Sequence, residues 1–136
     1  MPFVLDNSVV AGWFFADQTT PYTEAIAQRL LADTAWAPAI WELEATNVLR
    51  SACLRQRLNA QLAQQALVSL SQLPIEVDRH AVARSELLAL ALRFGLSTYD
   101  AAYLELALRK QLPLATKDAA LAEAALAAGV GVVPGA

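Results

Sequence analysis

Five short segments of strand-like composition alternate with longer segments of helical periodicity, and this alternation constrains the fold more than any other feature of the chain. The strands are expected at residues 3–5, 35–38, 75–78, 113–116 and 130–133. The helices are expected at residues 8–15, 20–33, 39–57, 60–73, 80–94, 98–110 and 118–129. Such an alternation is typical of an α/β domain built around a parallel sheet.

Residues with known preferences for helix ends mark where several of these helices begin and stop. Thr20 followed by Pro21 is a good helix start, Asn59 is an expected N-cap, and Gly95 is an expected helix end. The sequence contains no composition break, linker, low-complexity segment or internal repeat. We therefore expect residues 1–136 to form a single domain.

The composition limits how this chain can bind other molecules. Hydrophobic residues make up 57% of the chain and charged residues 17%, so we expect a large core and some apolar surface that another copy or a partner covers. The net charge is −3, whereas a protein that binds nucleic acid by charge alone is usually basic. Contact with a polyanion would therefore require something that offsets the acids, and a divalent metal ion would do so.

Other features of the sequence disfavour several classes of protein. The lone Cys53 forms neither an internal disulfide nor a thiolate zinc site by itself, so a reducing cytoplasm is the expected location. No apolar stretch approaches the roughly 20 residues of a membrane span, and no basic segment precedes the first apolar residues as in a secretion signal. The only histidine, His80, excludes a two-histidine ribonuclease, and no glycine-rich phosphate loop indicates a nucleotide cofactor.

Two acidic residues follow expected strands. Asp6 comes directly after the strand at residues 3–5, and Asp118 lies two residues after the strand at residues 113–116. In an open α/β sheet, sites form beyond the carboxyl ends of the strands. Two distant segments therefore each deliver a carboxylate to the same edge of the sheet.

Two further acids lie on helices and border the expected core. Glu44, Asn47 and Ser51 form a narrow polar stripe beside the apolar face of the helix at residues 39–57. Asp100 lies in the first turn of the helix at residues 98–110 and is followed by residues of mostly buried composition. Neither carboxylate is expected to face open solvent.

Each acid also has a purely structural explanation. Asp6 and Asp118 would serve as helix N-caps, and Asp100 would complete a capping box with Ser97. Glu44 would be a solvated helix residue. Four carboxylates that meet at one end of a sheet raise one another's pKa, however, and this is costly unless a cation neutralises them. Oxygen ligands of this kind suit Mg²⁺ or Mn²⁺.

Four segments, taken in order, resemble the motifs of the PIN-domain ribonucleases, and among these the VapC-like toxins of toxin–antitoxin pairs. They are VLDNSV with Asp6, WELEATNVL with the family's Glu-x-x-Asn at Glu44 and Asn47, STYDAAYLELA with Asp100, and LATKDAAL with Thr116 and Asp118. The resemblance extends from residue 4 to about residue 121. One motif alone is a weak signal, but the order, the spacing and the short chain make the set specific.

The resemblance implies both a fold and an activity. The implied fold is a PIN-like three-layer sandwich in which helices flank a central parallel five-stranded sheet. The implied activity is metal-dependent endonucleolytic cleavage of RNA, with Mg²⁺ or Mn²⁺ as the cofactor. The VapC-like members further imply a homodimer and a cognate antitoxin that inserts a segment near the acids.

The chemistry of phosphodiester hydrolysis assigns expected roles within this site. Asp6 and Asp100 are expected to be direct metal ligands, while Glu44 and Asp118 complete the shell, directly or through water, or orient or deprotonate the attacking water. The residues expected to hydrogen-bond and fix the carboxylates are Asn7, Ser8, Asn47 and Thr116. The residues expected to contact the RNA are Lys117 and Arg50.

The remaining basic and aromatic residues have ordinary explanations that we favour. Arg55 and Arg57 are expected to be solvated, and the aromatic residues 13–15 are expected in the core or a dimer interface, although they could also stack on bases. The leucine-rich residues 87–92 are expected in the core.

Two rival functions are kept open. An apolar strand that ends in Asp also begins haloacid-dehalogenase-like phosphatases, where Asp6 would be a covalent nucleophile; the chain, however, lacks the second Asp two residues further on. Alternatively, the acids would only dock a basic antitoxin segment, and the protein would be a non-catalytic binding module.

Overall fold

The computed structural model describes residues 1–135 and has an α/β architecture. The strands are β1 (Phe3–Leu5), β2 (Ala35–Pro38), β3 (Ile75–Asp78) and β4 (Leu114–Ala115). The helices are α1 (Asn7–Phe14), the short 3-10 helix η1 (Ala16–Gln18), α2 (Pro21–Arg29), α3 (Ile40–Leu54), α4 (Ala60–Ser71), α5 (Arg84–Phe94), α6 (Thr98–Lys110) and α7 (Ala119–Ala128). The predicted order of the seven α-helices and of the first four strands is confirmed.

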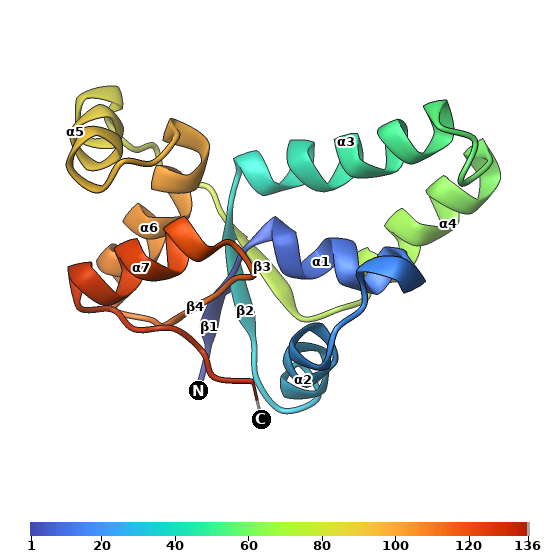
Figure 1. Cartoon of the computed structure of the whole chain (residues 1–136), viewed down its shortest axis with the longest axis horizontal. Coiled ribbons are helices and arrows are strands. Elements are labelled where there is room, and N and C mark those ends of the chain that lie inside the picture. The colour runs from blue at the N-terminus through green and yellow to red at the C-terminus, as the bar shows by residue number, and fades with distance from the viewer. Residues whose placement is uncertain (136) are drawn as a thin grey trace.

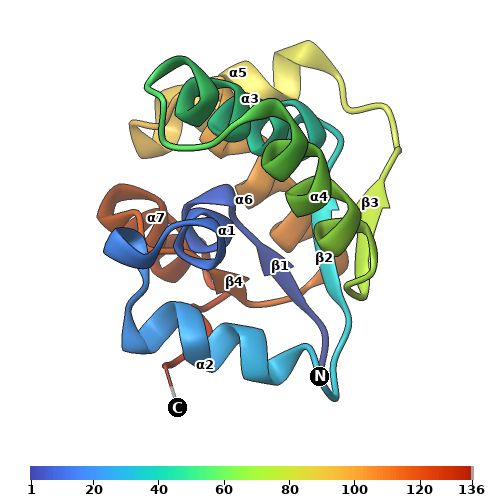
Figure 2. The same cartoon turned by 90° about the vertical axis from the view of Figure 1, so that its right-hand side faces the viewer.

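The strands form one parallel sheet in the order β3-β2-β1-β4. Helices α1, α2 and α4 lie on one side of this sheet, and α6 and α7 lie on the other, so the predicted three layers are present (Figures 1 and 2). Strand β1 is central, and all three of its residues are fully buried. This burial explains why β1 is a continuous apolar run and not an alternating one.

The sheet has four strands within residues 1–135, and the expected fifth strand at residues 130–133 is reduced to a single bridge between Val132 and Leu114. Two glycines cause this difference. Gly129 and Gly131 have φ values of 86° and 81°, which lie in the left-handed region, so the chain turns twice where a strand would be extended. The partner strand β4 has only two residues and offers little edge for pairing.

The helix expected at residues 80–94 begins four residues later, at Arg84, and His80 is exposed before it. Ala83 occupies the N-cap position and has no side chain that can cap, so no local signal extends the helix further back. The expectation that residues 87–92 lie in the core is wrong for Leu88 and Leu92, whose exposed fractions are 53% and 75%.

Close packing of α1 against α2 fixes the first layer. A Cβ atom at Gly12 would lie 2.5 Å from Thr23 Cγ2 and 2.9 Å from the Gln18 carbonyl oxygen, so only glycine allows this approach. Thr20 and Thr23 form a capping box at the start of α2, with Pro21 as its first residue. The Trp13 indole N–H donates to the Thr23 carbonyl oxygen at 2.8 Å and joins the two helices.

Helices α1 and α3 begin at the carboxyl ends of β1 and β2, at the opposite end of the sheet from the N-terminus (Figure 1). This end of the sheet therefore collects the residues that directly follow the strands. No helix within residues 1–135 combines the length and the apolar character that crossing a membrane requires.

Candidate active site at the carboxyl ends of the strands

Asp6 is the most buried of the predicted acids, with 5% of its surface exposed. Parallel pairing aligns Leu5 with Ala115, so the residue after β1 comes to lie beside the residue after β4. The Asp6 backbone N–H donates to the Ala115 carbonyl oxygen at 3.0 Å, and the Thr116 hydroxyl donates to Asp6 Oδ2 at 2.7 Å. The Ser8 hydroxyl donates to the same Oδ2 at 2.6 Å.

These contacts decide between the two explanations for Asp6. The residue occupies the N-cap position of α1, but its side chain makes no capping hydrogen bond, so helix capping does not account for it. Burial raises the pKa of the Asp6 carboxyl, and the hydrogen bonds from the Ser8 and Thr116 hydroxyls act in the opposite direction. The fold therefore buries a carboxyl group in the core and supplies hydroxyl donors that favour its charged form against the effect of burial.

The same two hydroxyls also organise the turn that follows β4. The Lys117 backbone N–H donates to Ser8 Oγ at 2.9 Å, and the Asp118 N–H donates to Thr116 Oγ1 at 3.0 Å. Each hydroxyl thus accepts from the backbone and donates its proton to Asp6. The interpretation of Ser8 and Thr116 as groups that fix a carboxylate agrees with these contacts.

Asp118 has a structural role beside the functional one expected for it. Its Oδ1 accepts from the Leu121 N–H at 3.0 Å and caps α7. A capping carboxylate uses one oxygen in this way, and the charge of Asp118 still raises the pKa of Asp100. Asp118 therefore caps α7 and also contributes its charge to the acidic site.

Glu44 is half-buried on α3 and is held by a residue that sequence analysis did not single out. The hydroxyl of Tyr103, which is fully buried on α6, donates to Glu44 Oε1 at 2.6 Å. Burial raises the pKa of Glu44, the Tyr103 hydrogen bond lowers it, and the charge of Asp6 raises it. Burial and the neighbouring Glu44 also raise the pKa of the Tyr103 hydroxyl. The only sequence signal for Tyr103 was its position in the STYDAAYLELA motif, three residues after Asp100.

Asp100 carries the clearest sign that the acids are coupled. Burial raises its pKa, and the charges of Asp6, Asp118 and Glu44, in that order, raise it further, to about 6. Its backbone N–H donates to the Ser97 hydroxyl at 3.1 Å, so Ser97 caps α6. The Asp100 carboxyl has no hydrogen bond within residues 1–135, so the expected capping box is only half formed.

The oxygen ligands available in this site suit a hard divalent cation, although the four carboxylates are not arranged as a complete metal-binding site. Four carboxylates from separate segments influence one another electrostatically, and all the donors are oxygens. The buried Oδ1 of Asn7 has no hydrogen-bond partner within residues 1–135 and is a further oxygen donor. Within the same residues, no three Asp, Glu, His or Cys side chains are already in position to hold one ion. The metal ligands therefore stay a prediction.

Three other predicted residues lie at or beyond the rim. Asn47 is exposed and makes no side-chain hydrogen bond within residues 1–135. Lys117 is exposed, and its Nζ donates to the Gln18 carbonyl oxygen at 3.1 Å. Arg50 is exposed about 120° around α3 from Glu44, so the structure does not bring it to the acids.

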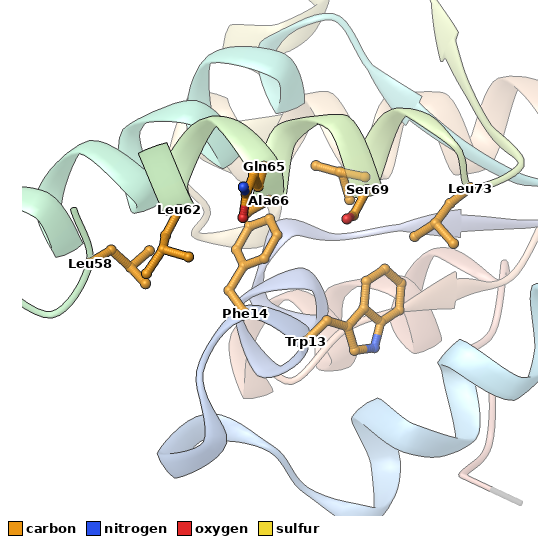
Figure 3. Close-up of a pocket in the computed structure, with 9 residues that line it drawn as sticks. Trp13, Phe14, Leu58, Leu62, Gln65, Ala66, Ser69 and Leu73 are labelled. Carbon is orange, nitrogen blue, oxygen red and sulfur yellow. The ribbon is translucent and has the colours of Figure 1, made fainter. Parts of the chain in front are cut away.

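An apolar pocket of about 400 Å³ lies apart from the acids, between α1 and α4. Figure 3 shows Trp13 and Phe14 pointing toward α4 and its flanking residues Leu58 and Leu73. Phe15 is buried, as expected for a core residue. Because this pocket lacks titratable groups, it does not provide hydrolytic chemistry.

Comparison with known proteins identifies the class to which this fold and site belong. The PIN domain family model matches residues 3–126, and the chain therefore belongs to the PIN domain family. Among curated proteins, the chain is similar to Ribonuclease VapC12 of Mycobacterium tuberculosis, in strains CDC 1551 / Oshkosh and ATCC 25618 / H37Rv. The identity is 32% over 105 residues, which cover 77% of this chain and 80% of the relative. The predicted resemblance to PIN-domain, VapC-like proteins is confirmed.

The fold is also similar to that in the crystal structure of PAE2754 from Pyrobaculum aerophilum. The TM-score is 0.70 at 20% sequence identity, with 98% of this chain and 88% of that chain covered. At this identity the similarity concerns the fold alone.

Proposed function

We propose that this protein is a metal-dependent endoribonuclease that hydrolyses RNA phosphodiester bonds and acts as the toxin of a toxin–antitoxin pair. Membership of the PIN domain family and the similarity to Ribonuclease VapC12 support this function. The observation that carries it is that burial, together with the charges of Asp6, Asp118 and Glu44, raises the pKa of Asp100 to about 6. A protein retains such repulsion where a bound cation relieves it.

A bound divalent ion would offset the charge of the carboxylates and of the phosphodiester, and would lower the pKa of the attacking water. Mg²⁺ is the proposed ion, with Mn²⁺ as the alternative, because both prefer oxygen ligands. Asp6 and Asp100 are the proposed direct ligands. Glu44 and Asp118 would complete the shell or hold the attacking water.

Other residues of this chain prepare those carboxylates. The Ser8 and Thr116 hydroxyls hold Oδ2 of Asp6, and Tyr103 holds Oε1 of Glu44, so the rotation of both carboxylates is restricted before a ligand arrives. Burial of Asp6 keeps bulk water away from one side of the site. In the proposed chemistry, Asp6 and Glu44 are therefore already held in place when the metal ion and the RNA bind.

The central test is RNA cleavage by purified wild-type protein, Asp6→Asn and Asp100→Asn, with Mg²⁺, Mn²⁺ or EDTA. We expect wild type to cut RNA only with a divalent ion, and both variants to lose cleavage while their circular dichroism spectra match wild type. A matched control is Glu123→Gln, which removes an exposed carboxylate from α7. Undiminished cleavage by both Asp variants would contradict the assignment.

A cellular test addresses the toxin activity. Expression of wild type should arrest growth, and sequencing of the 5′ ends of cellular RNA should reveal the cleaved sites. Asp6→Asn and Asp100→Asn should restore growth at equal protein levels. Arrest by both inactive variants would show that toxicity does not depend on the acidic site.

The rival functions make different predictions. A haloacid-dehalogenase-like phosphatase would form a phosphoaspartate on Asp6, which acid trapping and mass spectrometry would detect. A non-catalytic binding module would neither cut RNA nor bind Mn²⁺ in calorimetry. Family membership favours neither rival.

The proposed function implies three binding partners. RNA would be the substrate, and a cognate antitoxin would insert a segment near the acids. A homodimer would cover apolar side chains such as Leu88 and Leu92 on α5, which are exposed in the single chain. Light scattering after size-exclusion chromatography tests the dimer, and Leu92→Glu should weaken it if α5 lies in the interface. The cytoplasm stays the predicted location.

A further inference from the structure

A groove of about 260 Å³ lies between the α1–η1 segment and the second half of α3. Val48 and Ser51 line it from α3, Arg55 lines it from the C-cap position that follows α3, and Gln18 lines it from η1. The groove has no role in the chemistry described above.

The residues of α3 that line this groove lie in one row with Glu44, one of the proposed catalytic acids. Glu44, Val48, Ser51 and Arg55 are separated by four, three and four residues, a spacing that places them in one row along a helix. Eleven residues of helix span about 16 Å, at a rise of 1.5 Å per residue. The row therefore leads from the acidic site to the far end of the groove.

Basic side chains lie along this row at both ends. Arg55 is exposed and forms no ion pair within residues 1–135. Arg57 also lines the groove, with its guanidinium 4.7 Å from the centre of the Phe15 ring. At the end near the acids, Lys117 Nζ contacts the carbonyl oxygen of Gln18, which itself lines the groove. Three of the ten Lys and Arg residues of an acidic protein thus gather along one path.

Within residues 1–135, one acid forms an ion pair with these cations, and its interaction is weak. Asp17 Oδ1 lies 2.5 Å from Arg57 Nη2, but the Asp17 side chain is 64% exposed. Exposed ion pairs contribute little to stability, so a phosphate can compete for Arg57. Away from the acidic site, the groove therefore offers cations to an anionic chain and little negative charge against it.

We propose that this groove binds the sugar–phosphate backbone of single-stranded RNA on one side of the scissile phosphate, with Arg55 as the distal phosphate contact. This inference rests on the proposed ribonuclease function. The span of about 16 Å corresponds to about five nucleotides at 3.4 Å per nucleotide of a stacked strand. Because Arg57 already covers the Phe15 ring, the groove recognises charge and shape, not a particular base.

The test compares wild type, Arg55→Ala and Arg55→Glu, with Arg84→Glu as the matched control. Arg84 is exposed on α5 and has no ion pair within residues 1–135, so its reversal changes the net charge equally. Binding is measured by anisotropy of a labelled single-stranded RNA of about twelve nucleotides in EDTA, over a series of salt concentrations. Circular dichroism verifies that each variant is folded.

We expect Arg55→Glu to weaken RNA binding by about tenfold or more, and Arg55→Ala to weaken it less. The slope of log affinity against log salt should fall by about 0.7 for the lost phosphate contact with Arg55→Ala. Arg84→Glu should behave as wild type. Equal weakening by Arg84→Glu would show a general charge effect and overturn the inference.

Cleavage with Mn²⁺ separates this inference from the function on which it rests. Arg55→Glu should raise KM for the long RNA with little change in kcat, and should leave cleavage of an RNA too short to reach the groove unchanged. If wild type fails to cut any RNA, the proposed function fails. If wild type cuts RNA and the Arg55 variants bind and cut long RNA as wild type does, the groove assignment fails. An effect of Arg55→Glu on antitoxin binding would not rescue it, because the proposed occupant is RNA.

Discussion

Replacement of Asp100 by Asn should stabilise the metal-free protein while it abolishes activity. Burial and three neighbouring carboxylates raise the pKa of Asp100 from 3.8 to about 6. At neutral pH the charged form is therefore disfavoured in the folded state and not in the unfolded chain. Asn has nearly the same shape and carries no charge, so it removes both the cost of burying a charge and the repulsion from the other carboxylates.

The size of the effect follows from the pKa. A difference of about two between folded and unfolded pKa corresponds to about 3 kcal/mol above pH 6. The Asp100 side chain is partly exposed, and solvent screening reduces this to about 1–2 kcal/mol. For a chain of this length the unfolding entropy is about 0.29 kcal/mol/K, so Tm should rise by about 3–7 °C.

The pH dependence gives the effect a signature. Because the folded-state pKa is raised, the contribution of wild-type Asp100 to stability is present below about pH 3.8 and is lost as the pH rises through about 6. The Tm difference between Asp100→Asn and wild type should therefore be near zero at pH 4 and reach its full size above pH 6. Thermal melts in EDTA across this range measure it, with Glu123→Gln as the control.

Added metal should reverse the order of stability. The proposed binding of Mn²⁺ to the folded wild type should raise its Tm by mass action, whereas Asp100→Asn lacks a proposed ligand and should gain less. A Tm for Asp100→Asn that stays at or below wild type in EDTA at pH 7.5 would refute the reasoning, because it would show that the charged form of Asp100 is not disfavoured in the folded protein.

Three further substitutions test the two hydroxyl groups that hold Glu44 and Asp6 and the packing of α1 against α2. Tyr103→Phe removes the hydrogen bond to Glu44 and should cost about 1.5 kcal/mol in urea unfolding at pH 7.5, and calorimetry should show weaker Mn²⁺ binding; unchanged values would argue against a positioning role. Thr116→Val removes one of two hydroxyls from Asp6 and raises its pKa further, so it should cost about 1.5–3 kcal/mol at neutral pH and less in acid; an equal loss at both pH values would indicate that the cost comes from packing and the lost Asp118 N–H bond, and not from the charge of Asp6. Gly12→Ala forces a methyl group against α2 and should cost about 1–3 kcal/mol in thermal or urea unfolding, without a change in Mn²⁺ affinity.

The layered α/β architecture and the four acids could be predicted from the amino-acid sequence, because they depend on local signals. Apolar runs such as Phe3–Leu5 specify buried parallel strands, and a residue that directly follows such a strand lies at the functional edge of the sheet. The position of Asp6 at that edge therefore follows from the sequence alone. Caps such as Thr20 and Asn59 are equally local, and both were predicted correctly.

The way the acids are held and the course of the substrate groove depend instead on contacts across the fold. The hydrogen bond between Tyr103 and Glu44 joins residues 59 positions apart, and no local pattern encodes such a contact. The same limit explains the fifth strand, since the apolar composition of residues 130–133 predicts a strand while the turns at Gly129 and Gly131 and the two-residue β4 prevent it. Likewise, helix periodicity places Arg55 in a row with Glu44, but only the packing of α1 and η1 against α3 turns that row into a groove. Strand and helix formation depend on neighbours in sequence, whereas the electrostatics of a site depend on distances across the fold.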